Sequence, residues 1–409
     1  MESLPKPSTP SIKSLAFSHL RFPTLFSSTP LSDHNNHPIY SIDDHVHTAD
    51  HSPTPHKTPL SHIRKVAKKN QVDLVVITDH MSTRTSRHIT RLGLDEGPLP
   101  RLYPGSEEGS AQGHIGVWSF PARNQLKVQS TFQKLMKRIQ EINPQSLRVL
   151  NHPGWLRIGA RHYNEGSFQP HHPSGSLHAF EIMNGNPLLR FTSLRLLDQW
   201  HQFLSKGYRI SLVGGSDAHI SRRVGSVVTM VAADSPSLPV MIEAIKKGRT
   251  YVTDGPRLRF TLSPKSSNPR SSSQFESPPI YSYGDTFLIA NPVLQIQIQI
   301  HFYTELGGDL FLVHNGRNEH KVSLVPGCSS LEINIPATHL KQDGYFYIKF
   351  VHKEFKPLKR PRAKKRRNSK QRKPKKKVRG NYVDYLSLIS SPIYYDIPPF
   401  KDHWRPKNL

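Results

Sequence analysis

Apolar residues along the chain follow two patterns, one after the other. Between residues 38 and 262, short continuous apolar runs such as Asp73–Thr78 (DLVVIT) alternate with stretches such as Val128–Ile142, where apolar residues recur at helical spacing. A continuous run is typical of a strand buried on both faces, and helical spacing indicates a helix with one buried side. Repeated strand–helix units predict an α/β fold built on a parallel sheet or barrel.

The second pattern begins after a linker rich in Ser and Pro at residues 263–284. Val293–Phe302 (VLQIQIQIHF) alternates with a period of two, which indicates an antiparallel sheet with one buried face. Lys356–Arg379 interrupts this region with 15 Lys and Arg and no acid, and Tyr382–Tyr395 then returns to strand-like residues. We therefore expect an exposed basic insert between two strands.

Together these patterns predict the domain organisation. Residues 1–37 are rich in Ser and Pro, nearly free of acids and without periodicity, which is typical of a flexible arm. We expect this arm, a barrel domain at 38–262, the linker at 263–284, and a smaller antiparallel, β-sandwich-like domain at 285–400 that carries the basic insert at 356–380.

The composition indicates which kinds of partner to expect and excludes several structural classes. Lys and Arg number 56 against 30 Asp and Glu, a net charge of +26, which favours phosphorylated small molecules or nucleic acid as partners. The single Cys328 excludes an intramolecular disulfide framework and Cys-rich zinc sites. The sequence gives no indication of an oligomeric state.

The chain contains no segment expected to enter a membrane or a secretory pathway. No run of about 18 apolar residues is present, so we expect no transmembrane segment. The apolar stretch at residues 16–26 is broken by polar residues and proline, unlike a secretory signal. We expect a cytoplasmic protein, or a nuclear one in a eukaryote, where the basic insert would resemble a nuclear localisation signal.

Histidines and acids gather where the predicted strands end. His45-Val-His47 places two imidazoles on the same side of a strand, because side-chain direction repeats every second residue. Asp79-His80 directly follows DLVVIT, and Asp217-Ala-His219 follows another apolar run. Because the carboxyl ends of barrel strands are where barrel enzymes carry their chemistry, these side chains are candidates for one shared site.

Further groups fit the same site. Glu107 or Glu108 supplies a carboxylate able to bridge two metal ions, and His114 and His152 add imidazoles nearby in the pattern. Glu181 is a candidate for supporting a ligand or positioning a substrate. Imidazole and carboxylate donors suit Zn, Mn or Fe, so the cluster predicts a metal centre, although each residue alone has an ordinary structural explanation.

The ordered motifs HVHT, ITDH, PGSEEGSAQGH, NHPG, EIMNG and GGSDAH resemble the PHP (polymerase and histidinol phosphatase) superfamily. Within it the chain is similar to the CehA/McbA-type metallohydrolases, a similarity that includes GRTYVTDGP at residues 248–256 and the trailing β-rich region. The resemblance covers roughly residues 40–400. It implies a distorted (β/α)7 barrel that holds two or three divalent metal ions.

By motif, the resemblance also implies which residues bind the metal ions. The ligands would be His45, His47, His80, Glu107, His114, His152, Asp217 and His219. Asp50 and His51 are available for a further ligand after the first motif, but neither falls at the commonest spacing. Asp79, Glu108 and Glu181 would be additional ligands or their supports.

The chemistry that follows is metal-assisted hydrolysis, most simply of a phosphate ester by a metal-activated hydroxide. Arg157, Arg161, Arg222 and Arg249 are candidates to hold the phosphate, and the basic insert is a candidate contact for nucleic acid. The substrate would be a phosphorylated metabolite, a nucleotide or nucleic acid. The same ligands also suit a carbamate or amide hydrolase, and a polyanion-binding protein with an inactive barrel is a further alternative.

Overall fold

The computed structural model describes residues 37–48, 58–82, 84–110, 113–119, 131–153, 177–186, 193–266, 280–289, 293–340, 342–357 and 380–396. The predicted arm, with the exception of His37, lies outside these residues, and so does the greater part of the predicted linker and of the basic insert. Asp50, His51, Arg157 and Arg161 also lie outside them.

The chain forms a mixed α/β structure dominated by strands. Its first part contains, in order, β1 (Ile39–Val46), α1 (Leu60–Lys69), β2 (Leu74–Ile77), α2 (Arg84–Arg91), β3 (Arg101–Ser110), β4 (Gly113–Trp118), α3 (Phe132–Ile142), β5 (Leu147–Leu150), β6 (Ala179–Asn184), α4 (Ser193–Ser205), β7 (Ser211–Gly215), the 3-10 helix η5 (Ser221–Arg223), β8 (Val228–Ala232), α5 (Leu238–Lys246) and β9 (Thr250–Thr253). Its second part contains β10 (Arg257–Ser266), β11 (Thr286–Leu288), β12 (Val293–Thr304), β13 (Gly308–His314), β14 (Arg317–Leu324), β15 (Gly327–Pro336), the 3-10 helix η7 (Ala337–His339), β16 (Gly344–Pro357), β17 (Gly380–Ser390) and β18 (Ile393–Asp396).

Strands β1 to β7 lie next to one another in chain order. The pairs β1–β2, β2–β3, β5–β6 and β6–β7 are parallel, whereas β4 is antiparallel to both β3 and β5. The end of β7 returns to β1, because Val46 and Ala218 form a parallel bridge and the His47 N–H donates to the Ala218 carbonyl at 3.0 Å. The carboxyl ends of the first and last strands of this series therefore meet.

Local sequence explains why these elements form. All four residues of β2 (LVVI) are buried, as expected for a strand covered on both faces. In α3 the buried side chains are Phe132, Leu135, Met136 and Ile139, which lie on one face of the helix. The side chain of Thr131 caps α3 by accepting a hydrogen bond from the Lys134 N–H at 3.3 Å.

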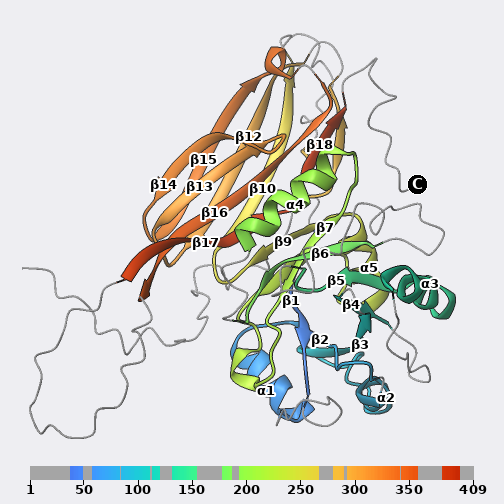
Figure 1. The fold of residues 1–409 in the computed structure, drawn as a ribbon. Coiled ribbons are helices and arrows are strands. Elements are labelled where there is room, and N and C mark those ends of the chain that lie inside the picture. Colours follow the sequence, from blue (N-terminus) through green and yellow to red (C-terminus); the bar gives the residue numbers. More distant parts are fainter. Residues whose placement is uncertain are drawn as a thin grey trace, which may run out of the picture.

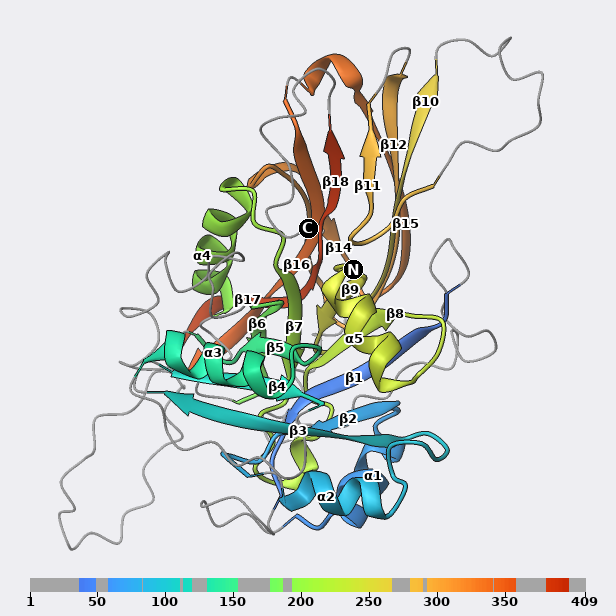
Figure 2. The same cartoon turned by 90° about the vertical axis from the view of Figure 1, so that its right-hand side faces the viewer.

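The strand-rich second part is joined to the first through a continuous sheet. β9 pairs with β8 on one side and with β17 on the other, and β8 pairs with β1, so one 15-stranded sheet runs through both parts (Figures 1 and 2). A separate sheet contains β10, β12 and β15, in which Ile296, Ile298 and Ile300 of β12 are buried. One hydrophobic cluster contains residues of both parts, for example Val75 and Phe346.

The ends of the basic insert are fixed by strand pairing. β16 ends at Pro357 and β17 begins at Gly380, and these two residues are paired in an antiparallel register. Residues 358–379 connect them and lie outside the described residues. None of the helices in the described part of the chain is long and apolar enough to cross a membrane.

Candidate metal centre

Strand ends bring the eight predicted metal ligands together. His45 is the penultimate residue of β1, His47 directly follows that strand, and His80 follows β2. Each of the others also lies on a strand or shortly after one: Glu107 in β3, His114 in β4, His152 after β5, and Asp217 and His219 after β7. Segments far apart in the sequence therefore place their polar side chains at one edge of the sheet.

Glu107 lies at the middle of the cluster. Its Oε1 atom is 2.9 Å from His152 Nε2 and 3.2 Å from His114 Nδ1, and its Oε2 atom is 2.9 Å from His80 Nδ1. Burial would raise the pKa of Glu107, but the positive charges of His45 and His114 hold it well below its ordinary value. Glu107 is thus an anion surrounded by imidazoles.

Glu108 does not face this cluster. Successive side chains of a strand point to opposite faces, and the Oε1 atom of Glu108 accepts a hydrogen bond from the Ser106 hydroxyl at 2.5 Å. Burial raises the pKa of Glu108 to about 7. Of the two neighbouring glutamates, Glu107 is therefore the one that can serve as a ligand.

His45 is held from both sides. Its Nδ1 atom lies 3.1 Å from Glu181 Oε1, and its Nε2 atom lies 3.4 Å from Glu107 Oε1 and 3.6 Å from Asp217 Oδ1. Burial alone would lower the pKa of His45, but the three carboxylates raise it well above its ordinary value. An Nδ1–H that donates to Glu181 leaves Nε2 as the atom that faces the cluster, which is the usual arrangement of a supported metal-binding histidine.

Asp217 contacts a histidine of each of the motifs His45-Val-His47 and Asp217-Ala-His219. Its Oδ1 atom lies 3.3 Å from both His47 Nε2 and His219 Nδ1. Burial lowers the pKa of His47 to about 4. Burial would raise the pKa of Asp217, but His45 and His47 hold it well below its ordinary value. A neutral imidazole and an ionised carboxylate are the forms in which these side chains bind metal ions.

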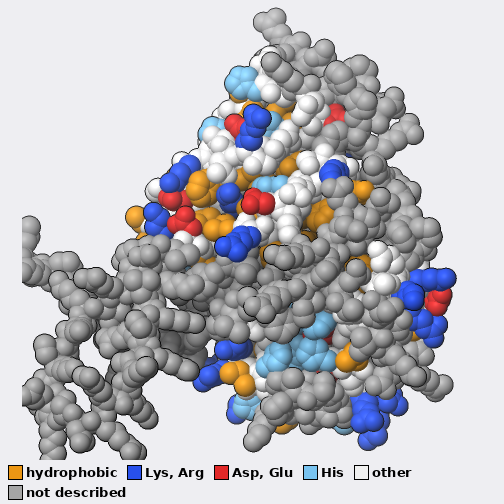
Figure 3. All heavy atoms as spheres, in the orientation of Figure 1, with side chains coloured by type: hydrophobic (Ala, Val, Ile, Leu, Met, Phe, Trp, Pro, Cys, Tyr) orange, Lys and Arg blue, Asp and Glu red, His pale blue; other side chains and the backbone are white. Residues whose placement is uncertain are grey.

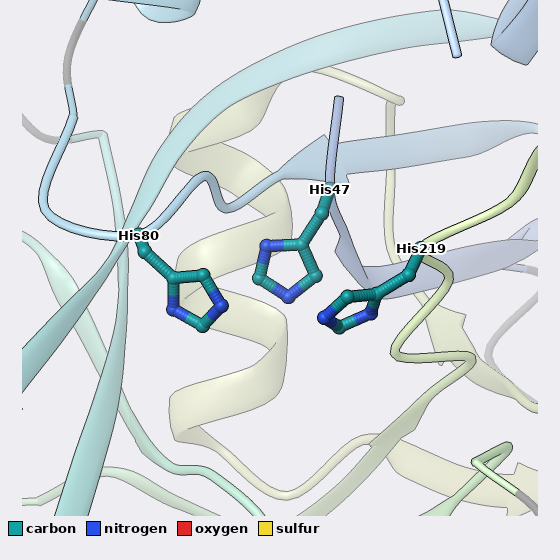
Figure 4. A group of neighbouring side chains, drawn as sticks. All are labelled: His47, His80 and His219. Atoms are coloured by element: carbon teal, nitrogen blue, oxygen red, sulfur yellow. The ribbon is translucent and has the colours of Figure 1, made fainter. Parts of the chain in front are cut away.

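The cluster has a buried floor and an open side. The side chains of His45 and His47 are at most 2% exposed, whereas those of His80, His114 and His219 are 19%, 30% and 32% exposed. Figure 3 shows a pale-blue patch of histidine side chains on one face of the molecule, and Figure 4 shows the rings of His47, His80 and His219 turned toward a common space. Within the described residues, the cluster is therefore open to solvent on the side of His80, His114 and His219.

Among the described residues, four overlapping groups of ligand atoms have the dimensions of metal sites. They are His47–His80–His219, His45–His47–Asp217, His45–Glu107–His152 and His80–Glu107–His114, and the ligand atoms within each lie within 4.8 Å of one another. Two of these groups share Glu107. Because an imidazole nitrogen binds one ion at a time, at least two ions can be held by separate histidines, with Glu107 able to bridge.

The donors fit divalent transition metals. The buried His45 Nε2 atom has no hydrogen-bond partner among the described residues, although two carboxylates face it. Burying an unsatisfied polar atom costs free energy, and a cation at this position would remove that cost. Imidazole and carboxylate ligands suit Zn, Mn or Fe.

Three other residues near the cluster act as supports. The Asp79 carboxylate accepts hydrogen bonds from the Thr48 N–H at 2.6 Å and from the Thr85 hydroxyl at 2.5 Å, and so ties the end of β1 to α2. The Asn151 side chain donates to Glu107 Oε1 at 3.0 Å. Asp43 accepts from the Ser216 N–H at 2.8 Å, which fixes the residue before Asp217.

Two of these supports, Asp43 and Asn151, were not predicted from the sequence. Their positions carry a usable signal, since Asp43 lies two residues before His45 on the same strand face and Asn151 directly precedes His152. Burial raises the pKa of Asp43 to about 6 even though backbone N–H groups donate to it. Both residues connect a ligand to a neighbouring strand.

The backbone is strained at two of the candidate ligands. His152 has a φ of 28° and Asp217 a φ of 49°, both in the left-handed region that residues other than glycine rarely adopt. The Glu181 carboxylate accepts a hydrogen bond from the His152 N–H and so holds one of these turns in place. Strain of this kind is frequent at functional sites, where surrounding contacts maintain it.

The structure does not bring all predicted phosphate-binding arginines to the cluster. Arg222 lies on the exposed 3-10 turn η5, three residues after His219. Arg249 lies beside the amino-terminal end of β1, because its carbonyl accepts from the Ala232 N–H and Ala232 is paired with Ile39. Ile39 lies six positions before His45 in β1, roughly 20 Å at about 3.3 Å per residue. Arg249 is thus remote from the site.

Comparison with known proteins finds a short match to one family. A family model described as PHP-associated matches residues 202–250, a segment that contains Asp217 and His219. A search of curated proteins gives no significant match.

Among solved structures, a two-domain protein from Bacteroides vulgatus that contains a predicted PHP-like metal-dependent phosphoesterase is 16% identical, with 79% of this chain and 93% of that chain covered and a TM-score of 0.46. PsfC from Pseudomonas syringae is 16% identical over 50% of this chain and 87% of its own, with a TM-score of 0.39. The lesion-specific endonuclease PfuEndoQ from Pyrococcus furiosus is 13% identical over 51% of this chain and 56% of its own, with a TM-score of 0.39.

Proposed function

We propose that the protein is a metal-dependent hydrolase of the PHP type, in which the eight clustered residues hold two or three divalent ions and hydrolyse a phosphate ester. The observation that carries this proposal is the convergence of six histidines, from five strands or strand ends, on Glu107 and Asp217. The PHP-associated match at residues 202–250 supports it, since that segment supplies Asp217 and His219. A protein that had lost its activity would not be expected to keep a complete ligand set.

We also propose how the two parts of the chain are organised as domains. Strands β1 to β7, closed by the bridge between Val46 and Ala218, would form the distorted (β/α)7 barrel within residues 38–262. The strands after the linker would form a β-sandwich-like domain within residues 285–400. The CehA/McbA branch is favoured by the order of the motifs and by this second, strand-rich part.

In this proposal the side chains divide into ligands and supports. Hydrolysis adds the oxygen of water to phosphorus, breaks the bond to the leaving oxygen and returns a proton to that oxygen. Divalent ions supply hydroxide near neutral pH and offset the charge that develops on the phosphate. Glu107 and Asp217 provide the negative charge that holds such ions, Glu181 orients His45, and Asn151 orients Glu107.

The open side of the cluster favours an anionic substrate. Three partly exposed histidines face solvent there, and the chain as a whole carries a net charge of +26. A basic protein attracts phosphate groups over long distances and concentrates them near its surface. A metal centre with the same ligands could also hydrolyse a carbamate or amide bond. Activity assays with each kind of substrate distinguish a phosphoesterase from a carbamate or amide hydrolase.

The test is hydrolysis by the Asp217→Asn variant after loading with Zn or Mn. Chromogenic phosphomonoester, phosphodiester and carbamate substrates are assayed in parallel. We expect turnover of a phosphate ester by the natural protein and a loss of at least about a hundredfold in the variant, because the amide keeps the volume but removes the charge that holds the ions. Asp384→Asn, an exposed residue of β17, is the matched control and should be fully active.

If only the carbamate substrate is hydrolysed, the protein is a carbamate hydrolase and the phosphoesterase proposal is wrong. Absence of all hydrolysis in the metal-loaded natural protein would overturn the enzyme proposal and favour a binding protein with an inactive barrel.

A further inference from the structure

Helix α2 carries a row of basic residues, three arginines and a histidine, on its exposed face. Its sequence, RTSRHITR, contains no acid, and Arg84, Arg87, His88 and Arg91 are all exposed. These positions follow the spacing i, i+3, i+4 and i+7, so they lie along one face, while Thr85, Ser86 and Ile89 are buried on the other. We call this row the α2 cationic face.

The arginines of this face have no acidic partner within the described residues. The ion pairs of Lys and Arg found there are Arg138–Glu141, Lys246–Glu243 and Lys321–Asp309, and none involves α2. Like charges three or four residues apart on a helix destabilise it by about 0.2–0.5 kcal/mol per pair. An external anion would remove this repulsion.

The α2 cationic face is held in a fixed position relative to the metal centre. The Thr85 hydroxyl donates to Asp79 at 2.5 Å, and Asp79 is the neighbour of His80. The Ser86 hydroxyl donates to the carbonyl of Gly105 at 3.0 Å, two residues before Glu107 on β3. Figures 1 and 3, drawn in one orientation, show Lys and Arg side chains over α2 on the same face of the molecule as the histidine patch.

The dimensions suit a chain of phosphates and exceed those of a single one. Arg91 lies seven positions after Arg84, a rise of about 10 Å along the helix axis, which corresponds to roughly three nucleotide steps of 3.4 Å for a strand in duplex geometry. Four residues separate His80 from Arg84, so their Cα atoms are at most roughly 14 Å apart. A strand with one phosphate at the metal centre could therefore place its next phosphates along α2.

We propose that the α2 cationic face binds the phosphate backbone of a nucleic-acid strand whose target phosphodiester lies at the metal centre. The inference rests on the proposed function and narrows its substrate class from phosphate esters in general to polynucleotides. A phosphorylated metabolite with one phosphate at the metal centre would leave this face without a ligand. Because α2 offers mainly arginine charge and no exposed Phe, Tyr or Trp side chain, the contact would depend chiefly on the backbone and not on base sequence.

The experiment compares the Arg87→Gln/Arg91→Gln variant with the natural protein. Arg84, the arginine of α2 nearest His80 in the chain, is kept. Binding of a fluorescent single-stranded oligonucleotide with hydrolysis-resistant phosphorothioate linkages is measured by anisotropy over a series of KCl concentrations. Hydrolysis of a small chromogenic phosphodiester is measured in parallel. The matched control is Arg259→Gln/Arg317→Gln, which removes two exposed arginines from β10 and β14.

We expect the α2 variant to bind the oligonucleotide more weakly. Each neutralised phosphate of a single strand contributes about 0.7 to the slope of log affinity against log salt, so the loss of two arginines should make this slope shallower by about 1.4. Hydrolysis of the small phosphodiester should be unchanged, and the control should keep both properties. Glutamine favours helix, so the far-ultraviolet circular dichroism should also be unchanged.

Equal slopes in the α2 variant and the control would overturn the inference, and continued hydrolysis of the small substrate would then leave the proposed function intact. Loss of binding to phosphatidylserine vesicles with unchanged oligonucleotide binding would assign the face to a membrane surface and also overturn the inference. Failure of the proposed function would be recognised differently, by absence of hydrolysis in the natural protein.

Discussion

At the scale of single residues, Glu181 has the most specific supporting role. Its two carboxylate oxygens accept from two different donors, Oε1 from His45 Nδ1 and Oε2 from the His152 N–H. An amide at this position has one acceptor oxygen and one NH2 group, so Glu181→Gln cannot satisfy both donors. We expect the affinity for Zn to fall by about 10- to 100-fold, the usual effect of losing the support of a metal-binding histidine.

This expectation is checked by competition with a chromophoric zinc chelator. Glu243→Gln, an exposed residue of α5, serves as the control and should bind Zn as the natural protein does. If Glu181→Gln binds Zn with unchanged affinity, Glu181 does not set the orientation of His45.

The sequence alone could predict the candidate metal-binding residues but not the residues that hold them in place. His45 and His47 share a strand face and His80 follows a buried strand, so their convergence follows from periodicity. The hydrogen bond from Asn151 to Glu107 joins residues 44 positions apart and leaves no local pattern. Arg249 shows the converse error, because its place in the motif GRTYVTDGP said nothing of which end of the sheet it occupies.

At the scale of elements, Gly116 of β4 determines how closely β4 and the end of β5 approach. A Cβ atom at Gly116 would lie 2.7 Å from Asn151 Oδ1, closer than side chains tolerate. We expect Gly116→Ala to displace Asn151, to lower the affinity for metal ions and to destabilise the fold by about 1–3 kcal/mol, as overpacking does. Metal competition and thermal unfolding measure the two effects.

A double-mutant cycle shows whether the effect passes through Asn151. Gly116→Ala/Asn151→Ala should bind metal ions no more weakly than Asn151→Ala alone, because the clash is then absent. Gly307→Ala, whose Cβ would lie 3.5 Å from its nearest neighbour, should have little effect. Additive losses in the double variant would show that Gly116 acts independently of Asn151.

The alternation of strands and helices predicted a parallel sheet, which the pairs β1–β2, β2–β3, β5–β6 and β6–β7 confirm, but it did not predict the reversed direction of β4. β3 and β4 are separated by residues 111 and 112 alone, and so short a connection forces an antiparallel pair where repeated strand–helix units would give a parallel one. The motif PGSEEGSAQGH, at residues 104–114, contains this connection. Periodicity alone reports that a segment is a strand and says nothing of its partner.

At the scale of the whole molecule, the two parts predicted as separate domains share one sheet. The joining pair is β9 and β17, whose paired residues Val252 and Ile389 are 137 positions apart in the numbering. No local pattern in the sequence specifies so distant a pairing. The change from helical to two-residue periodicity, in contrast, was visible because it is local.

The basic insert can be removed without touching the proposed ligands. Because Pro357 and Gly380 are already paired, a short Gly-containing turn can replace residues 358–379. We expect metal content and turnover of a small phosphate ester to stay nearly unchanged. Binding of duplex DNA should weaken, and the salt slope should become shallower by about 0.9 for each phosphate that the shortened protein fails to neutralise.

Anisotropy titrations over a range of salt concentrations, with elemental analysis alongside, provide the readout for this deletion. An unchanged salt slope would show that the insert does not bind nucleic acid. Unfolding of the strand-rich part would instead show that the segment is needed for pairing of β16 and β17.

The most direct test of the metal centre is elemental analysis of the purified protein and of its Glu107→Gln variant. Glu107 belongs to two of the four ligand groups found among the described residues, so its substitution should weaken more than one ion site. Glu108→Gln changes the neighbouring residue, which lies outside the cluster, and should leave the metal content unchanged. We predict two to three equivalents of Zn, Mn or Fe in the natural protein and at most one in Glu107→Gln. A natural protein without metal that takes up none from Zn or Mn solutions, or equal metal content in both glutamate variants, would contradict the assignment.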